Sequence, residues 1–189
     1  MLTYPHINPI ALDLGAIKVH WYGLMYLLAF LFAWGFASYR AKQRDNWNAD
    51  MVSDLVFYGA LGVILGGRIG YVFFYGFEQF LANPLWLFQV WTGGMSFHGG
   101  FIGVMLAMIF WCRKYQKSWF ETLDFIAPCV PTGLMFGRMG NFIGGELYGR
   151  QVTDPNFALG MIFPTDPLGL VRHPSQLYQA LCEGLILFI

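Results

Sequence analysis

Charged residues are scarce in this sequence. Only 12% of its 189 residues are Asp, Glu, Lys or Arg, whereas about 25% is usual for a soluble domain. Hydrophobic residues make up 57% of the chain and aromatic residues 19%. A soluble protein of this length could not bury so much apolar surface, so we expect the lipid bilayer to be its solvent.

Excess charge of one sign and paired cysteines are also missing. The formal net charge is zero, and no basic run suggests binding to nucleic acid. The cysteines Cys112, Cys129 and Cys182 show no CxxC spacing, and the histidines show no HxxxH or HxxE spacing. We therefore expect no disulfide framework, no metal or other cofactor and no nucleic-acid partner, and we interpret the cysteines as small packing residues.

Long apolar segments are abundant, and they have the length that a helix needs to cross a membrane. The sequence predicts an all-α, polytopic helical bundle, with a single membrane domain over residues 1–189 and an extracytoplasmic loop at 144–174. The expected spans are 21–39, 54–76, 95–112, 119–143 and 175–189, the last of them incomplete. Because that last segment would be only about 22 Å long at 1.5 Å per residue, we expect further spans to be missing from the sequence.

Basic residues in the loops predict the orientation of these spans. Six of the eleven basic residues follow the first or the third expected span: Arg40, Lys42, Arg44, Arg113, Lys114 and Lys117. By the positive-inside rule this side is cytoplasmic, which puts the N-terminus outside.

Polar side chains recur near the outer ends of all five expected spans. In chain order they are His20, Tyr22, Arg68, Tyr71, His98, Arg138, Asn141, Arg172, His173 and Tyr178. A charged residue within a span costs about 2.5–3.5 kcal/mol on insertion scales, less near the interface, and usually faces a cavity or a partner. The pattern therefore predicts a polar site that opens toward the outer leaflet.

The segment GRMGNFIGGELYG, residues 137–149, concentrates such groups beside closely spaced glycines. Arg138 and Asn141 are three residues apart and share one face of a helix. A guanidinium near headgroup level suits a phosphodiester, because its planar fork donates two hydrogen bonds to phosphate oxygens. The glycine spacing also permits close approach of a neighbouring helix or a ligand.

The pair Gly144–Gly145 is a predicted helix break that frees Glu146 to fold back toward Arg138. The alternative is that Arg138 forms an ion pair with Glu146 or Asp124 and only links helices. Periodicity alone leaves both interpretations open.

Three further polar residues each have a structural and a functional interpretation. Ser96 is a predicted helix cap that leaves His98 in the first turn, where the helix N-terminus favours a neutral ring able to accept a proton. The alternative for His98 is a structural hydrogen-bond donor. Tyr22 is either part of the site or an interfacial aromatic, and Arg68 either reaches the site or extends to the surface.

At these residues the sequence resembles the prolipoprotein diacylglyceryl transferase family. The resemblance covers nearly the whole chain, through HWYGLMY, GGRIGYVFFY, GGMSFHGG, GRMGNFIGGELYG and RHPSQLY in the family's order. It implies a seven-span bacterial inner-membrane protein with an external N-terminus and an active site toward the outer leaflet.

The resemblance also implies a reaction and roles for particular residues. Phosphatidylglycerol would donate its diacylglyceryl group to the lipobox cysteine of a preprolipoprotein signal peptide, giving a thioether and glycerol 1-phosphate. Arg138 would bind the lipid phosphate and stabilise the leaving group, His98 would accept the thiol proton, and Tyr22 would orient a substrate. The headgroup pocket would be completed by Asn141, Glu146, Gly149 and Arg68.

Two other functions compete with this interpretation. A transporter would use the polar residues for permeation, although no internal repeat is visible. A lipid-binding scaffold would bind anionic headgroups without consuming them. The sequence shows no large soluble interface, and we expect a monomer.

Overall fold

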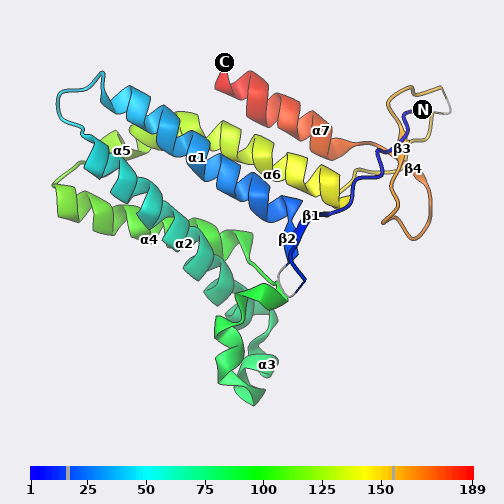
Figure 1. The fold of residues 1–189 in the computed structure, drawn as a ribbon, viewed down its shortest axis with the longest axis horizontal. Coiled ribbons are helices and arrows are strands. Elements are labelled where there is room, and N and C mark those ends of the chain that lie inside the picture. Colours follow the sequence, from blue (N-terminus) through cyan, green and yellow to red (C-terminus); the bar gives the residue numbers. More distant parts are fainter. Residues whose placement is uncertain (16–17, 155) are drawn as a thin grey trace. The chain divides into compact units, whose positions relative to one another are not determined.

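The computed structural model describes residues 1–15, 18–154 and 156–189, most of which are helical (Figure 1). The prediction of a helical protein is confirmed at this level. Two short antiparallel strand pairs were not expected. The chain packs as two compact units: unit 1 contains Met1–Gly35 and Ala127–Ile189, and unit 2 contains Phe36–Ile126. The single membrane domain stays a prediction.

Unit 2 is built around two long helices. Its elements after α1 (Trp21–Ala41), which begins in unit 1, are α2 (Ala49–Tyr75), α3 (Phe77–Ala82), η1 (Pro84–Phe88), η2 (Val90–Thr92), α4 (Phe97–Tyr115) and α5 (Trp119–Ile126). The Asn48 side chain caps α2 by accepting a hydrogen bond from the Met51 N–H at 2.8 Å. This cap explains why α2 begins five residues before the expected span.

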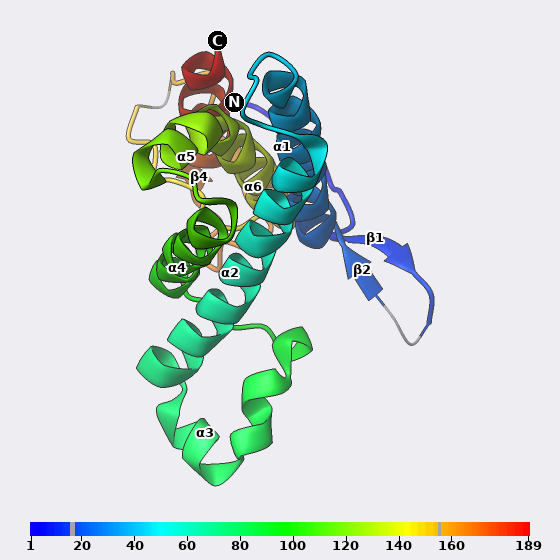
Figure 2. The same ribbon diagram turned by 90° about the vertical axis from the view of Figure 1, so that its left-hand side faces the viewer.

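Glycines allow α2 and α4 to pack with their backbones in contact (Figure 2). A Cβ atom on Gly70 would lie 2.7 Å from the Gly99 Cα, and one on Gly103 would lie 2.9 Å from the Gly66 Cα. Real Cβ atoms do not approach backbone so closely, so only glycine fits at this seam. Near the other end, the Trp111 indole donates to the Met51 carbonyl at 3.0 Å, which makes the pair antiparallel.

The two basic loops of unit 2 meet one aromatic cluster. Trp47 stacks on Phe125 with a centroid distance of 3.6 Å. The Arg44 guanidinium lies 5.4 Å from the Phe125 ring, and the Lys117 ammonium lies 5.3 Å from the Trp47 ring. The basic residues after α1 and after α4 therefore lie at the same end of this unit, as the orientation argument requires.

Unit 1 combines helices with the two strand pairs. Its elements besides the first part of α1 are β1 (Ile10–Asp13), β2 (Lys18–His20), η3 (Ala127–Cys129), α6 (Val130–Gly144), β3 (Met161–Ile162), β4 (Val171–Arg172), α7 (Ser175–Gln179) and η4 (Ala180–Ile186), a π-helical segment. The expected span 119–143 is thus divided into α5, η3 and α6. Proline explains the division, since Pro128 and Pro131 have no N–H to continue the helical hydrogen bonds.

Two described helices, α1 and α2, are long and apolar enough to cross a membrane. Only 6% of the apolar window of α1 is buried, whereas the core helix of a soluble protein would be mostly buried. This exposure fits a lipid-facing helix. The number of spans and the missing C-terminal spans stay predictions.

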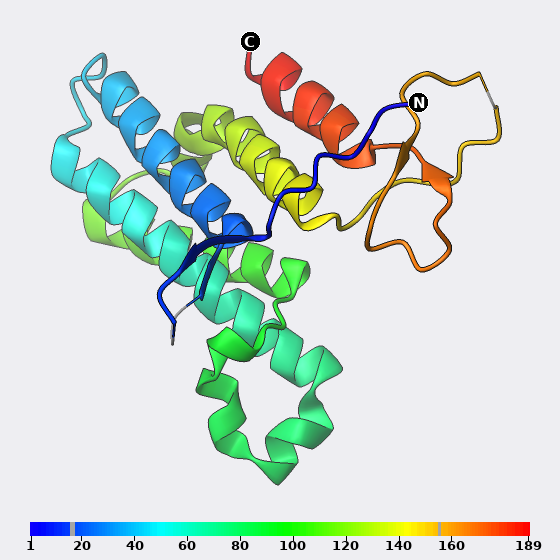
Figure 3. The same ribbon diagram turned by 45° about the vertical axis from the view of Figure 1, so that its right-hand side comes forward.

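The N-terminal segment of unit 1 closes over the end of α6 (Figure 3). Tyr4 packs in a buried cluster with Phe142, Met161 and Phe163. Its hydroxyl donates to the carbonyls of Phe142 at 2.8 Å and Ile143 at 3.0 Å. Both carbonyls belong to the last turn of α6, where no following helical turn supplies N–H donors, so Tyr4 stabilises this turn.

An ion pair orders the segment that connects β3 to β4. The Asp166 carboxylate accepts hydrogen bonds from the Arg172 guanidinium at 2.7 Å and from the backbone N–H groups of Leu168 and Leu170. The bonds from Arg172, helped by the two backbone donors, hold the pKa of Asp166 down at about 2. A buried charge with this many donors fixes the loop geometry.

Candidate functional site

Unit 1 brings together four of the predicted site residues at the start of α1 and the end of α6. Gly140 permits the approach, because a Cβ there would lie 3.0 Å from the Tyr22 ring atom Cδ2. Arg138 and Asn141 flank Gly140 on α6. Glu146 follows the end of the same helix, and its carboxyl group lies 3.6 Å from where a Cβ of Gly144 would be. Tyr22, Arg138, Asn141 and Glu146 therefore form one polar cluster, which we call the α6 cluster.

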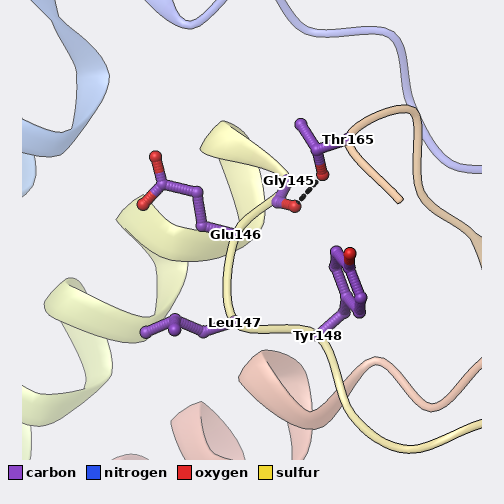
Figure 4. A pocket seen from close by; sticks show the side chains of 5 residues that line it. All are labelled: Gly145, Glu146, Leu147, Tyr148 and Thr165. Atoms are coloured by element: carbon purple, nitrogen blue, oxygen red, sulfur yellow. Dashed lines mark hydrogen bonds between the residues drawn. The ribbon is translucent and has the colours of Figure 1, made fainter. Parts of the chain in front are cut away.

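The turn after α6 gives Glu146 its place. Gly145 adopts φ +67°, its N–H donates to the Phe142 carbonyl at 3.0 Å, and the Glu146 N–H donates to the Asn141 carbonyl at 2.8 Å. This is a Schellman C-cap, which favours glycine at the left-handed position. The predicted helix end after Gly144 is confirmed. The Glu146 carboxylate lies back beside the final turn, 3.6 Å from where a Cβ of Gly144 would be (Figure 4).

The polar side chains on α6 have donors to offer a ligand. Arg138 is half-buried, and in the described part of unit 1 it makes no hydrogen bond or ion pair, so the alternative of a salt bridge to Glu146 is not formed. The side-chain amide of buried Asn141 likewise hydrogen-bonds to no described residue. A half-buried guanidinium and a buried amide without hydrogen-bond partners among the described residues of unit 1 suit an anionic, oxygen-rich ligand.

Residues that the sequence analysis missed hold the Gly145–Tyr148 turn in place. The Thr165 hydroxyl donates to the Gly145 carbonyl (Figure 4). The buried Gln176 amide donates to the Glu146 carbonyl at 2.5 Å, while its own oxygen has no partner among the described residues. Gly145, Glu146, Leu147, Tyr148 and Thr165 line an open cavity of about 290 Å³. Because these partners lie 20 to 30 residues away, no local pattern could have indicated them.

Gly149 is locked against the RHPSQLY segment. Its N–H donates to the His173 carbonyl at 2.8 Å, and a Cβ on it would lie 2.9 Å from that oxygen. His173 Nδ1 lies 3.3 Å from the Tyr178 hydroxyl. These contacts give Gly149 a structural reason to be glycine, and its role in lipid binding stays a prediction.

His98 lies in unit 2, in the first turn of α4. The Ser96 hydroxyl accepts a hydrogen bond from the Gly99 N–H at 3.2 Å, which confirms the predicted cap. The His98 side chain is exposed. It makes no hydrogen bond to a residue that the structure describes, so its ring is available to a substrate.

Arg68 does not extend to the surface, so that alternative is wrong. The residue is 2% exposed, and its guanidinium donates to backbone carbonyls of Trp86, Leu87 and Gly93. These bonds occupy most of the donors that a lipid phosphate would need. The role of Arg68 in lipid binding stays a prediction.

Comparisons with known proteins agree on one family. The family model for prolipoprotein diacylglyceryl transferase matches residues 9–189. The chain is 82% identical over all of its 189 residues to phosphatidylglycerol–prolipoprotein diacylglyceryl transferase of Acinetobacter baumannii (strain ACICU), covering 70% of that relative. It is also 82% identical over its full length to the protein of the same name from Acinetobacter baylyi, covering 69% of it. With the corresponding protein of Psychrobacter arcticus the identity is 57%, over all of this chain and 72% of the relative.

Proposed function

The chain belongs to the prolipoprotein diacylglyceryl transferase family, and on this premise we propose how its residues transfer the diacylglyceryl group from phosphatidylglycerol to a prolipoprotein. The protein is a transferase of lipoprotein biosynthesis. The acceptor in this proposal is the lipobox cysteine of the prolipoprotein signal peptide, and the proposed reaction involves no cofactor.

The proposed reaction is a displacement at carbon. The cysteine thiolate attacks the diacylglyceryl carbon that bears the phosphate oxygen, a C–S bond forms, and the C–O bond breaks. The products are the thioether-linked lipid and glycerol 1-phosphate. A general base of the protein takes the thiol proton. Two needs follow, because a free thiol is mostly protonated near pH 7 and because negative charge builds up on the leaving phosphate.

The α6 cluster supplies the positive charge that stabilises the leaving phosphate. The observation that carries the proposal is that Arg138, half-buried on α6 close to the contact of Gly140 with Tyr22, has a guanidinium unengaged by described residues of its unit. Arg138 binds the phosphodiester and stabilises the developing phosphate monoester. Asn141 donates to a phosphate oxygen, and Glu146 and Tyr22 bind the glycerol hydroxyls.

His98 supplies the base that deprotonates the cysteine thiol. Its exposed ring lies in the first turn of α4 and makes no hydrogen bond to a described residue, and an imidazole nitrogen can accept a proton. His98 takes the thiol proton as the C–S bond forms.

The proposed setting is the bacterial cytoplasmic membrane, crossed several times, with the N-terminus outside. The clustering of the basic loops 40–44 and 113–117 at one end of unit 2 supports this orientation. Arg68 and the start of α4 lie at the opposite end of that unit, since Ser96 donates to the Gly67 carbonyl at 2.9 Å. That end would face the outer leaflet and the signal peptide.

The proposal is tested by replacing Arg138 and a matched arginine. Arg138→Gln should lower kcat for release of glycerol phosphate by about 100-fold or more, the usual effect of removing one donor to a developing anion. Arg150→Gln is the control, because Arg150 is exposed and its side chain makes no described contact. Near-parental turnover of Arg138→Gln with phosphatidylglycerol in mixed micelles would contradict the assignment.

A cysteine-to-serine acceptor peptide separates the transferase from a lipid-binding scaffold. A transferase consumes phosphatidylglycerol only when the peptide has its thiol. A scaffold binds the lipid equally with both peptides and releases no glycerol phosphate.

A further inference from the structure

Arg68 is a buried cation with an unusual set of partners. Its guanidinium donates from Nε to the Leu87 carbonyl at 2.9 Å, from Nη2 to the Trp86 carbonyl at 2.5 Å and from Nη1 to the Gly93 carbonyl at 2.5 Å. It also lies 4.6 Å from the centre of the Trp86 ring. In the part of unit 2 that the structure describes, no carboxylate pairs with it. Burying a guanidinium is costly unless its N–H donors are hydrogen-bonded, and here backbone carbonyls accept those hydrogen bonds.

The loop is shaped to present those carbonyls. Gly93 and Gly94 have φ values of +82° and +83°, which L-residues with side chains rarely adopt. The ring of Tyr71, one helical turn after Arg68, packs against Gly94 and leaves no space for a Cβ there. Arg68 and Tyr71 thus hold residues 86–94 in place, with the Trp86 ring against the guanidinium. We call this arrangement the Arg68 clamp.

The clamp leads directly into the helix that carries His98. Ser96, two residues after the double glycine, donates its N–H to the carbonyl of Gly67, the neighbour of Arg68. Ser96 then caps α4, and His98 is the second residue of that helix. Both the loop and the helix start are therefore held by consecutive residues of α2.

We propose that Arg68 is a positioning residue for His98: it acts as the template on which residues 86–94 fold, and so fixes where α4 and its histidine begin. The inference rests on the proposed role of His98 as proton acceptor. In this proposal Arg68 acts through the loop and not as a ligand of the lipid headgroup, since its planar donors are directed at three backbone carbonyls. A lysine has the same charge but a single donor centre, and cannot satisfy carbonyls spread around a guanidinium plane.

Arg68→Lys is the informative substitution. It keeps the positive charge, so a headgroup ligand would retain part of its function. A displaced His98 should lower kcat for peptide modification by about 10- to 100-fold, as small misplacements of catalytic groups do, and leave the apparent KM for phosphatidylglycerol within about twofold. Gly94→Ala breaks the clamp from the loop side and should reproduce this pattern. Arg113→Lys is the control, because Arg113 is exposed and its guanidinium makes no described contact.

Hydrogen exchange gives a readout that does not depend on catalysis. The amides of Gln89, Thr92 and Gly93 donate within the loop and should exchange faster in Arg68→Lys than in the Arg113→Lys control. Unchanged exchange together with unchanged kcat would overturn the proposal. A raised KM for phosphatidylglycerol at constant kcat would also overturn it and make Arg68 a headgroup ligand.

A double-mutant cycle with His98→Gln separates the positioning role of Arg68 from the proposed role of His98 as the base. If Arg68 acts through His98, Arg68→Lys costs little further kcat once His98 is replaced. Equal losses of kcat in the parent and in His98→Gln would overturn the positioning role. If His98→Gln alone keeps parental turnover, the proposed base is wrong, while faster exchange in the loop would still establish the clamp.

Discussion

The glycine seam between α2 and α4 allows a stability prediction with an internal control. Gly103→Ala adds a Cβ that would lie 2.9 Å from the Gly66 Cα and 3.0 Å from the Gly62 carbonyl carbon. Gly100→Ala, on the same helix, adds a Cβ whose nearest neighbour is the Val63 carbonyl oxygen at 3.6 Å, an ordinary contact. Both changes are chemically identical, and both sites lie within α4.

The expected difference in the free energy of unfolding comes from the overpacking at Gly103, which Gly100→Ala does not cause. Alanine favours a helix interior over glycine by about 1 kcal/mol, a gain that cancels in the comparison. Overpacking costs about 1–3 kcal/mol, and at Gly103 it should reach the upper end, since the obstructing atoms are backbone and cannot change rotamer. We therefore expect Gly103→Ala to be less stable than Gly100→Ala by about 3 kcal/mol.

The assay is reversible unfolding in mixed micelles, followed by tryptophan fluorescence while the fraction of denaturing detergent is raised. Both variants are measured beside the parent under the same lipid composition. Equal stabilities, or a more stable Gly103→Ala, would refute the backbone contact between the helices. Gly103→Ala should also lower turnover, because α4 carries His98.

Two further predictions concern unit 1. Tyr4→Phe keeps the ring in its cluster but removes the hydroxyl that donates to two carbonyls at the end of α6, so the free energy of unfolding should fall by about 1–2 kcal/mol; an unchanged unfolding midpoint in mixed micelles would contradict this. Asp166→Asn should lower the thermal midpoint at pH 7, because Arg172 holds the pKa of the parent carboxyl at about 2. The folded-state pKa lies below the unfolded value of about 4, so the parent has this stabilisation above pH 4 and loses it as the pH falls toward 2. The two thermal midpoints should converge over that window, and a constant difference would argue against the ion pair as the cause.

Features set by neighbouring residues were predictable from the sequence. The Ser96 cap and the turn at Gly145 both depend on a few adjacent residues, since a cap hydroxyl binds a nearby N–H and a left-handed turn favours glycine. The structure has both. The grouping of Arg138 and Asn141 on one face followed in the same way from helix geometry.

Features set by distant contacts were not predictable. Tyr4 binds carbonyls 138 and 139 residues away, and the acceptors of Arg68 lie 18 to 26 residues along the chain. The glycine spacing indicated close packing, but Gly133 and Gly137 have open space around them, while the tight seam lies between α2 and α4. Spacing says that a close approach is possible, and only the fold decides which glycines use it.

The central claim is that this protein couples consumption of phosphatidylglycerol to modification of a cysteine thiol. The most direct measurement follows both products at once, with the purified protein, phosphatidylglycerol micelles and a lipobox peptide. Mass spectrometry quantifies the diacylglyceryl thioether, and an enzymatic assay quantifies glycerol 1-phosphate. The account predicts equal amounts of the two products, neither of them with a Cys→Ser peptide. Glycerol phosphate released without the thiol, or thioether formed without glycerol phosphate, would contradict it.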